Sequence, residues 1–318
     1  MQRKIIIALL FLVLLSVLLL FVLLGCSQEP NIGEIVNSLA GKDYETPTLV
    51  SVNSASSQIV MLEFSEPVKI YGSSFEPFVA RSDGKYVYVT LNSSLQPGTQ
   101  SKISGRVSDY SGNTTGFSVN VWGFNPLMPK LLINELTTKG TDKSPCRTEL
   151  KVLEDGNVNG LTLYCGIPDD NDCKFVFGDV DVKKGDFIVV WWTEKIPDNA
   201  DANCLNFCAQ SSERPATNNG AQVLCDTPSL GAHILDAVLY SNFSASHEGY
   251  GTKAASQRAS WVISAGAWEG IAIDSTSSTA TRSMSRNLNG QDTNKCNDWF
   301  VTVTSGATFG LDNTSQAY

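Results

Sequence analysis

The chain has 318 residues, of which 42% are hydrophobic and only 17% charged, with a formal net charge of −9. So few charges argue against a helical bundle or coiled coil, while the aromatic and β-branched content argues against disorder. An acidic chain with two histidines also lacks the basic surface that binds nucleic acid. We therefore expect one large or two ordinary domains and no nucleic-acid partner.

The first 25 residues differ from all that follow. Two basic residues precede an apolar run, 5–24, that ends in Gly25-Cys26. A basic start, an apolar run and a small residue before a cleavage point are typical of a secretory signal peptide. A cysteine at this place resembles the lipobox of bacterial lipoproteins. The resemblance implies cleavage before Cys26, palmitate-like acylation of that residue, and a membrane partner held through the lipidated N-terminus.

An uncleaved signal anchor is the alternative, because about 20 apolar residues can span a bilayer. Both interpretations place the rest of the chain outside the cytoplasm, as a membrane-attached protein of the bacterial cell envelope, at the outer membrane or the periplasmic face. Cleavage would change the net charge from −9 to −11. Residues 26–47 are expected to be a tether.

Residues 48–125 have the pattern of an all-β domain. Short runs rich in aromatic and β-branched residues alternate with turn residues at the intervals of a sandwich. The seven expected strands are Leu49–Val52, Ile59–Phe64, Val68–Ile70, Phe78–Ala80, Tyr86–Leu91, Ser101–Val107 and Phe117–Trp122. Phe64–Val68 (FSEPV) and the stretch from Val107 to Asn113 resemble bacterial Ig-like domains of surface proteins, which implies an Ig-like sandwich.

A junction bracketed by Pro126 and Pro129 is the expected domain boundary. Strand-like runs continue beyond it, and Glu154–Asn157 is expected to join two of them as a hairpin. These runs are Leu131–Leu136, Thr148–Val152, Leu161–Tyr164, Phe187–Trp192, Ile234–Tyr240 and Trp299–Thr304. The sequence thus predicts an all-β chain with two tandem sandwiches.

A series of short motifs lies along residues 131–313. They include Asn134-Glu135, Thr148-Glu149-Leu150, Asp236 to Tyr240, Arg286, Asp292-Thr293, Asp298-Trp299, Gly310 and Asn313. This order resembles the lamin-tail domain (LTD) as it occurs in bacterial lipoproteins. The resemblance implies a second Ig-like sandwich over residues 130–318, although the family's tryptophan is missing near Leu161. Two apparent insertions, 196–232 and 243–281, are the first places to look for binding specificity, and 251–264 is expected to be helical.

Seven cysteines remain after Cys26, all in the second domain. The disulfide candidates are Cys146, Cys165, Cys173, Cys204, Cys208, Cys225 and Cys296. An exported chain favours disulfides, and an odd number leaves one thiol over. Cys146 is expected to approach Cys165, and Cys204 and Cys208 to join the first insertion to Cys225. A zinc site formed by Cys204 and Cys208 with Cys225 or His233 is the alternative.

Two acidic loops offer hard oxygen ligands. Asp169, Asp170 and Asp172 form one, and the other runs from Asp198 to Asp201. Calcium prefers such ligands, although Asp and Asn also favour plain turns. We expect no cofactor other than a calcium ion at these ligands. In an alternating strand, one of Trp191 and Trp192 should face inward and the other outward.

No catalytic motif is apparent. His247-Glu248 lacks the second histidine of a zinc-protease helix, and there is no Gly-x-Ser-x-Gly elbow. We therefore expect a lipid-anchored, non-catalytic structural or binding module with a protein or glycan ligand, not an enzyme. The alternatives are an accessory subunit of an extracellular hydrolase or nuclease, and an adhesin for host matrix or glycan.

Overall fold

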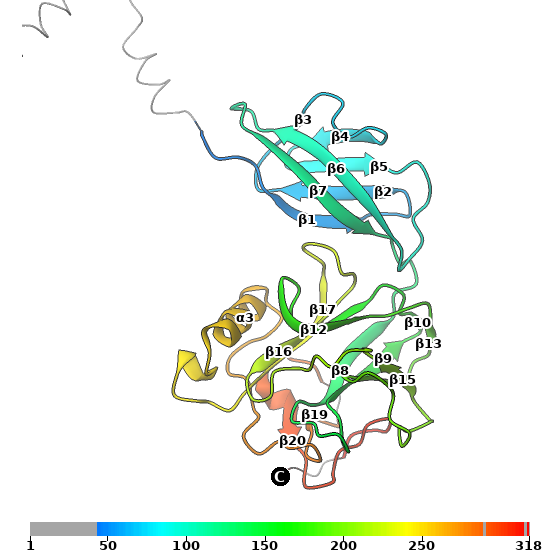
Figure 1. Cartoon of the computed structure of the whole chain (residues 1–318), viewed down its shortest axis with the longest axis vertical. Coiled ribbons are helices and arrows are strands. Elements are labelled where there is room, and N and C mark those ends of the chain that lie inside the picture. Colours follow the sequence, from blue (N-terminus) through cyan, green and yellow to red (C-terminus); the bar gives the residue numbers. More distant parts are fainter. Residues whose placement is uncertain (1–42, 289–290, 315–316, 318) are drawn as a thin grey trace, which may run out of the picture. The chain divides into compact units, whose positions relative to one another are not determined.

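Strands make up nearly all of the regular structure, which confirms the all-β class (Figure 1). The structure is a computed structural model that describes residues 43–288, 291–314 and 317. The signal peptide, Cys26 and most of the tether lie outside these residues. Within them, the single α-helix is α3 (Lys253–Ser264), and no helix has the length and hydropathy that crossing a membrane requires.

The seven strands expected in residues 48–125 are confirmed, with small changes at their ends. They form a four-stranded sheet, β1-β2-β5-β4, and a three-stranded sheet, β3-β6-β7. The bounds are β1 (Leu49–Ser54), β2 (Ile59–Phe64), β3 (Lys69–Ile70), β4 (Val79–Asp83), β5 (Tyr86–Thr90), β6 (Gln100–Ser108) and β7 (Thr114–Trp122). Gly84, with φ of 59°, makes the β4–β5 turn, because glycine adopts positive φ without strain.

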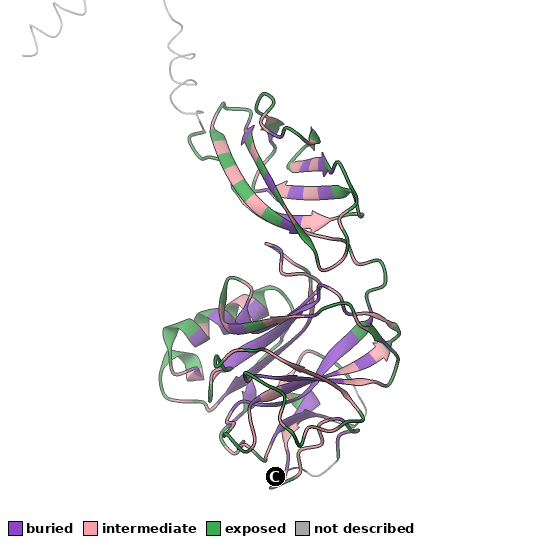
Figure 2. Cartoon of the chain, turned by 45° about the vertical axis from the view of Figure 1, so that its right-hand side comes forward, coloured by how far each residue is buried: buried purple, intermediate pink, exposed green. Residues whose placement is uncertain are grey.

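Alternation builds the core between these two sheets. Along β2, Val60, Leu62 and Phe64 are buried and the residues between them are more exposed, as the period of two in a strand requires. Ile103 and Val121 from the opposite sheet join the same buried cluster. Figure 2 shows the resulting bands of buried and exposed residues along the strands.

Two larger sheets follow in residues 130–301. One has the order β15-β14-β9-β8-β19-β20 and the other the order β12-β11-β16-β17-β18, and β10 pairs with β13. The bounds are β8 (Lys130–Thr137), β9 (Arg147–Glu154), β10 (Gly156–Asn157), β11 (Thr162–Ile167), β12 (Asp170–Val176), β13 (Asp181–Val182), β14 (Phe187–Trp191), β15 (Leu205–Cys208), β16 (Gly220–Cys225), β17 (Ile234–Ser241), β18 (Ile273–Asp274), β19 (Met284–Arg286) and β20 (Trp299–Val301).

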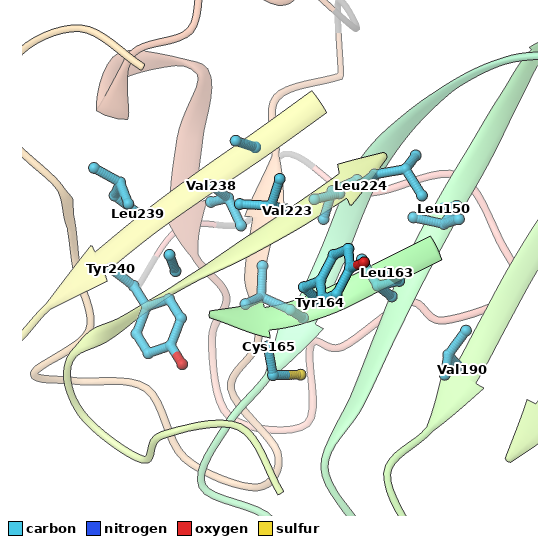
Figure 3. Packing of buried hydrophobic residues seen from close by; sticks show 14 of the residues in the cluster. Leu150, Leu163, Tyr164, Cys165, Val190, Val223, Leu224, Val238, Leu239 and Tyr240 are labelled. Carbon is cyan, nitrogen blue, oxygen red and sulfur yellow. The ribbon is translucent and has the colours of Figure 1, made fainter. Parts of the chain in front are cut away.

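The inner faces of the two larger sheets share one hydrophobic cluster. Leu150 and Val190 come from the six-stranded sheet, and Leu163, Val223 and Val238 come from the five-stranded sheet. Figure 3 shows these side chains close together. This arrangement is a β-sandwich.

The hairpin expected at Glu154–Asn157 is wrong. Strand β9 pairs with β8 and β14, whereas β11 pairs with β12 and β16. The chain therefore crosses from one sheet to the other at this turn. The local signal for a tight turn was present, but strand partners are chosen by the packing of the two sheets, which turn residues do not report.

Part of the first apparent insertion, 196–232, belongs to the two sheets. It contributes the edge strand β15 and the interior strand β16, which lies between β11 and β17. Strand β16 escaped detection because its apolar residues are interrupted by Gln222, which is nonetheless fully buried. The helix expected at 251–264 is confirmed as α3, which contacts β11 and β16 and is capped by Thr252.

Candidate functional site

The ordered motif residues converge on one buried polar network at the six-stranded sheet. Arg286, at the end of β19, is 1% exposed and forms ion pairs with Asp236 on β17 at 3.0 Å and with Asp292 at 2.9 Å. Its Nε also donates to the carbonyl of Ile133 on β8 at 3.0 Å. Because β8 and β17 belong to different sheets, this arginine joins the two layers.

Asp236 is held from both sides. One of its carboxylate oxygens accepts a hydrogen bond from the backbone amide of Ile133 at 2.6 Å. The other accepts one from the backbone amide of its neighbour Ala237 at 2.8 Å. Burial raises the pKa of Asp236 to about 7, and the adjacent Arg286 acts in the opposite direction. A buried arginine and carboxylate that satisfy each other so fully serve as a structural tie.

A pair of buried carboxyl groups lies beside this tie. Glu135 on β8 and Glu149 on β9 are register partners, and neither is exposed. Glu135 accepts hydrogen bonds from Ser283 and Ser285. Burial raises the pKa of both groups, that of Glu149 to about 8, where the charge of Glu135 adds to the rise.

A C-terminal segment, Thr308–Asn313, covers these carboxyl groups, and we call it the strap. The amide of Thr308 donates to Glu135 at 3.0 Å, and the amide of Gly310 donates to Glu149. The Asn313 side chain donates to the carbonyl of Arg286 at 2.7 Å. The strap therefore supplies backbone donors to the two glutamates and ties itself to the arginine.

Sequence reasoning missed Arg147, which begins β9. Its guanidinium lies over the rings of Trp191 at 4.7 Å and Phe309 at 4.0 Å. Its Nε is buried without a hydrogen-bond partner, and burial lowers its pKa while Glu135 and Glu149 oppose that change. The only signal in the sequence was its place directly before the Thr148-Glu149 motif.

A cavity of about 420 Å³ opens on the outer side of the network. Its mouth carries the Lys151–Asp312 ion pair, 2.6 Å long. The lining residues are Leu132, Asn134, Lys151, Leu153, Arg286, Asn287, Leu288, Asp312 and Asn313. Amide, carboxylate and ammonium groups beside leucines suit a small polar ligand or a polar chain.

A second cavity, of about 270 Å³, lies by the first apparent insertion. Pro197, Ser211, Ser212 and Arg214 from that segment line it together with Trp192. Only β15 and β16 of this segment join the sheets, and binding at its cavity stays a prediction. Part of the other insertion, α3, instead packs on the five-stranded sheet.

The expectation that one of the paired tryptophans is exposed is wrong, because both are buried. Trp191 donates from Nε1 to Asn206 on β15 at 2.8 Å, and Arg147 covers its ring. Trp192 donates to Thr148 at 2.9 Å. Neither Arg147 nor strand β15 was predicted as a contact of these tryptophans. Trp299 is also buried, as expected of a packing residue.

The loop expected to bind calcium has another partner. Asp170 and Asp172 lie on β12 and form ion pairs with Arg258 of α3 at 2.7 and 2.9 Å, while Asp169 is exposed. Two of the three proposed ligands are thus already neutralised by an arginine. Calcium binding here stays a prediction, and these ion pairs are the observation against it.

Among the cysteines, the structure joins no two of the seven that it describes, so the disulfides stay predictions. It brings Cys146, Cys165 and Cys173 together as one cluster. Cys204 directly precedes β15 and Cys208 ends it, so about 13 Å of extended chain separates them at 3.3 Å per residue. Zn–S bonds are about 2.3 Å, so this separation is the observation against the zinc alternative, which stays a prediction.

Comparisons with known proteins place the second sandwich in a family. A family model described as "TP_1001_2nd: protein second domain" matches residues 129–301. A Treponema pallidum (strain Nichols) protein described as uncharacterized is 26% identical over 159 residues, which is 46% of this chain and 40% of that protein. The match thus spans about two fifths of that relative's length. A crystal structure of a DUF4876 family protein from Bacteroides thetaiotaomicron VPI-5482 is 10% identical, covers 84% of this chain and 92% of its own, and has a TM-score of 0.34.

Proposed function

We propose that the sandwich over 130–318 is a non-catalytic binding module of the bacterial cell envelope. The chain belongs to the second-domain family, whose model spans residues 129–301. The signal peptide and Cys26 attach it to the membrane. Within this proposal, the sandwich is lamin-tail-like and residues 48–125 are Ig-like. The start of the family match at Pro129 supports the boundary at the proline-bracketed junction.

The observation that carries the proposal is that the charged motif residues satisfy one another. Arg286 is paired with Asp236 and Asp292, and the strap covers Glu135 and Glu149. A general acid or base must come within hydrogen-bond distance of its substrate. Residues that are buried and fully bonded to the protein instead stabilise a scaffold that presents a surface.

The cavity beside the network is the proposed binding surface. Lys151, Asn287 and Asp312 offer one cationic, one amide and one anionic group around its mouth. Such mixed polar groups favour a protein or glycan ligand. The net negative charge supports the absence of a nucleic-acid partner.

The location is tested by proteolysis of intact cells. We expect the wild-type protein to fractionate with membranes and the Cys26→Ala variant to lose its lipid and be released from them or remain unprocessed. Digestion from outside the cell would support a surface role, and protection would support a periplasmic role and exclude the adhesin. A Cys26→Ala protein that is lipidated and sorted like the wild type would overturn the anchor.

Binding is tested on arrays of glycans and matrix proteins with the purified chain. Lys151→Ala should reduce binding at least tenfold, and Lys130→Ala, an exposed lysine at the start of the neighbouring strand β8, should not. Hydrolase turnover by the purified chain that a point substitution abolishes would overturn the non-catalytic proposal. Co-purification with a hydrolase or nuclease would favour the accessory-subunit alternative.

A further inference from the structure

Two of the buried cysteines face each other across neighbouring strands. Cys165 on β11 and Cys173 on β12 are direct register partners in an antiparallel pair. Cα atoms of directly opposed residues are about 4.5–5.5 Å apart, within the range of about 4.4–6.8 Å that a disulfide spans. The Cys173 thiol is among the groups that raise the pKa of Cys165, so the two thiols lie close together.

A third thiol completes the cluster from the opposite side of the sandwich. Cys146 precedes β9 of the six-stranded sheet, and its Sγ accepts the amide of Gly140 at 3.2 Å. All three cysteines are at most 3% exposed. Figure 3 shows Cys165 pointing into the core in the region of Tyr240. One bond within this cluster leaves one thiol, which fits the odd number of cysteines.

We propose that Cys165 and Cys173 form a cross-strand disulfide and that Cys146 stays a buried free thiol. The register pair is favoured because the β11–β12 ladder already fixes its geometry, whereas Cys146 is held by the Gly140 turn. The proposal rests on the export proposed above, because thiols remain reduced in the cytosol.

The bond is made by thiol–disulfide exchange with a disulfide donor, either a dithiol oxidoreductase or glutathione disulfide. One cysteine, as its thiolate, attacks a donor sulfur, the donor's S–S bond breaks, and one donor thiolate leaves. The second cysteine loses its proton to water and attacks the mixed disulfide at the protein sulfur, which releases the other donor thiolate. Two cysteines thereby lose two electrons and two protons, and one donor disulfide is reduced.

Burial of the two cysteines determines at which stage of folding the disulfide can form. The folded core keeps both sulfurs from a donor, and burial raises the pKa of Cys165 well above that of an ordinary thiol, which removes the reactive thiolate. The exchange must therefore precede closure of the sandwich. We expect the folded, reduced chain to resist oxidation and the unfolded chain to be oxidised as it refolds.

Mass spectrometry of the full chain tests the pairing without any substitution. Trypsin leaves Cys165 and Cys173 in one peptide, 152–174, and Cys146 in another, 144–147, as the positions of Lys and Arg dictate. After refolding in detergent with oxidised and reduced glutathione, and alkylation under denaturing conditions, peptide 152–174 should be two hydrogen masses lighter and unalkylated. Cleavage before Asp169 should give two fragments that stay joined until reduction, while 144–147 is alkylated.

Two further measurements separate this proposal from the export proposal. The chain recovered from cells under acid quench should carry the same bond. A bond that forms on refolding but is absent in cells would overturn the export premise and leave the pairing standing, whereas a bond to Cys146, or three alkylated thiols after refolding, would overturn the pairing. Reduction should lower the Tm of the wild type and of Cys146→Ser by about 5 °C more than it lowers the Tm of the Cys165→Ser/Cys173→Ser variant.

Discussion

Glu135 and Glu149 lie directly opposite each other on β8 and β9, and both carboxyl groups are fully buried. Like charges directly opposite in a sheet destabilise it. Hydrogen-bond donors from the strap and from Asn134, whose side-chain amide donates to Glu149 at 2.7 Å, offset this repulsion. The raised pKa of Glu149 also keeps that carboxyl protonated at neutral pH.

Stability should therefore fall as the solution becomes alkaline. The pKa of Glu149 is about 8 in the folded chain and about 4.3 when unfolded, so the folded state holds a proton that the unfolded state has released. The stabilisation is complete below the unfolded pKa and is lost as pH rises through about 8. We expect a loss of a few kcal/mol between pH 5 and 9, measured as the free energy of unfolding in urea.

Glu149→Gln should reduce this pH dependence, because the amide is neutral throughout, while the raised pKa values of Asp236 and Glu135 leave part of the slope. Glu154→Gln, at the exposed end of the same strand, is the matched control and should retain the wild-type slope. An equal slope in all three proteins would show that Glu149 does not hold the proton.

Loss of the Arg286–Asp236 ion pair between the two sheets should lower the stability of the folded chain. Arg286→Met leaves the carboxylate of Asp236 buried without its cation, and breaking one side of a buried pair costs about 3–5 kcal/mol. Lys151→Met breaks the ion pair to Asp312, which is 78% exposed on the aspartate side, and should cost less than about 1 kcal/mol. Thermal unfolding followed by circular dichroism measures both, and equal losses would contradict the structural role of Arg286.

The strap should depend on Asn313. In Asn313→Ala the Arg286 carbonyl and the Asn134 side chain lose partners at 2.7 and 3.0 Å, which costs about 1–3 kcal/mol when the groups stay buried. We expect faster proteolysis near the C-terminus along with the lower Tm. Thr314→Ala, at the next and exposed position, should leave both unchanged, and a strap that is equally resistant in the two variants would argue against this anchoring.

Helix α3 should be held to the sheet by Arg258. Arg258→Ala removes the ion pairs to Asp170 and Asp172 and should cost about 1 kcal/mol, because the aspartates are partly exposed. Lys253→Ala, at the exposed start of the same helix, is the control. Titration calorimetry should show no calcium binding that depends on Asp170, since Arg258 pairs with two of the three carboxylates of this loop. A calcium-dependent rise in the wild-type Tm that Asp170→Asn abolishes would contradict this and restore the calcium site.

Local pattern was sufficient for most strands of the fold. The alternation of Val60, Leu62 and Phe64 and the apolar run of β14 identify strands because side chains point to opposite faces with a period of two. Thr252 and the residues after it similarly predict α3. These features depend on neighbours in the chain, so the sequence alone determined the all-β class and the approximate element bounds.

The sequence pattern identified the motif residues but did not predict that they form one buried network. Glu135 and Glu149 are 14 positions apart and Arg286 is far from both in sequence, so only the pairing of β8 with β9 and β19 makes them one network. Arg147 carried no motif, and its role comes from Trp191 and Phe309.

The sequence by itself determined that the chain is all-β, where most strands and the helix lie, and which residues have a lipoprotein-like pattern. Only the tertiary structure decided that β9 and β11 belong to different sheets, that both Trp191 and Trp192 are covered, and that Cys165 faces Cys173. The physical reason is that alternation and capping act over a few residues. Strand partners and buried charge pairs are instead set by long-range packing, which a local pattern does not contain.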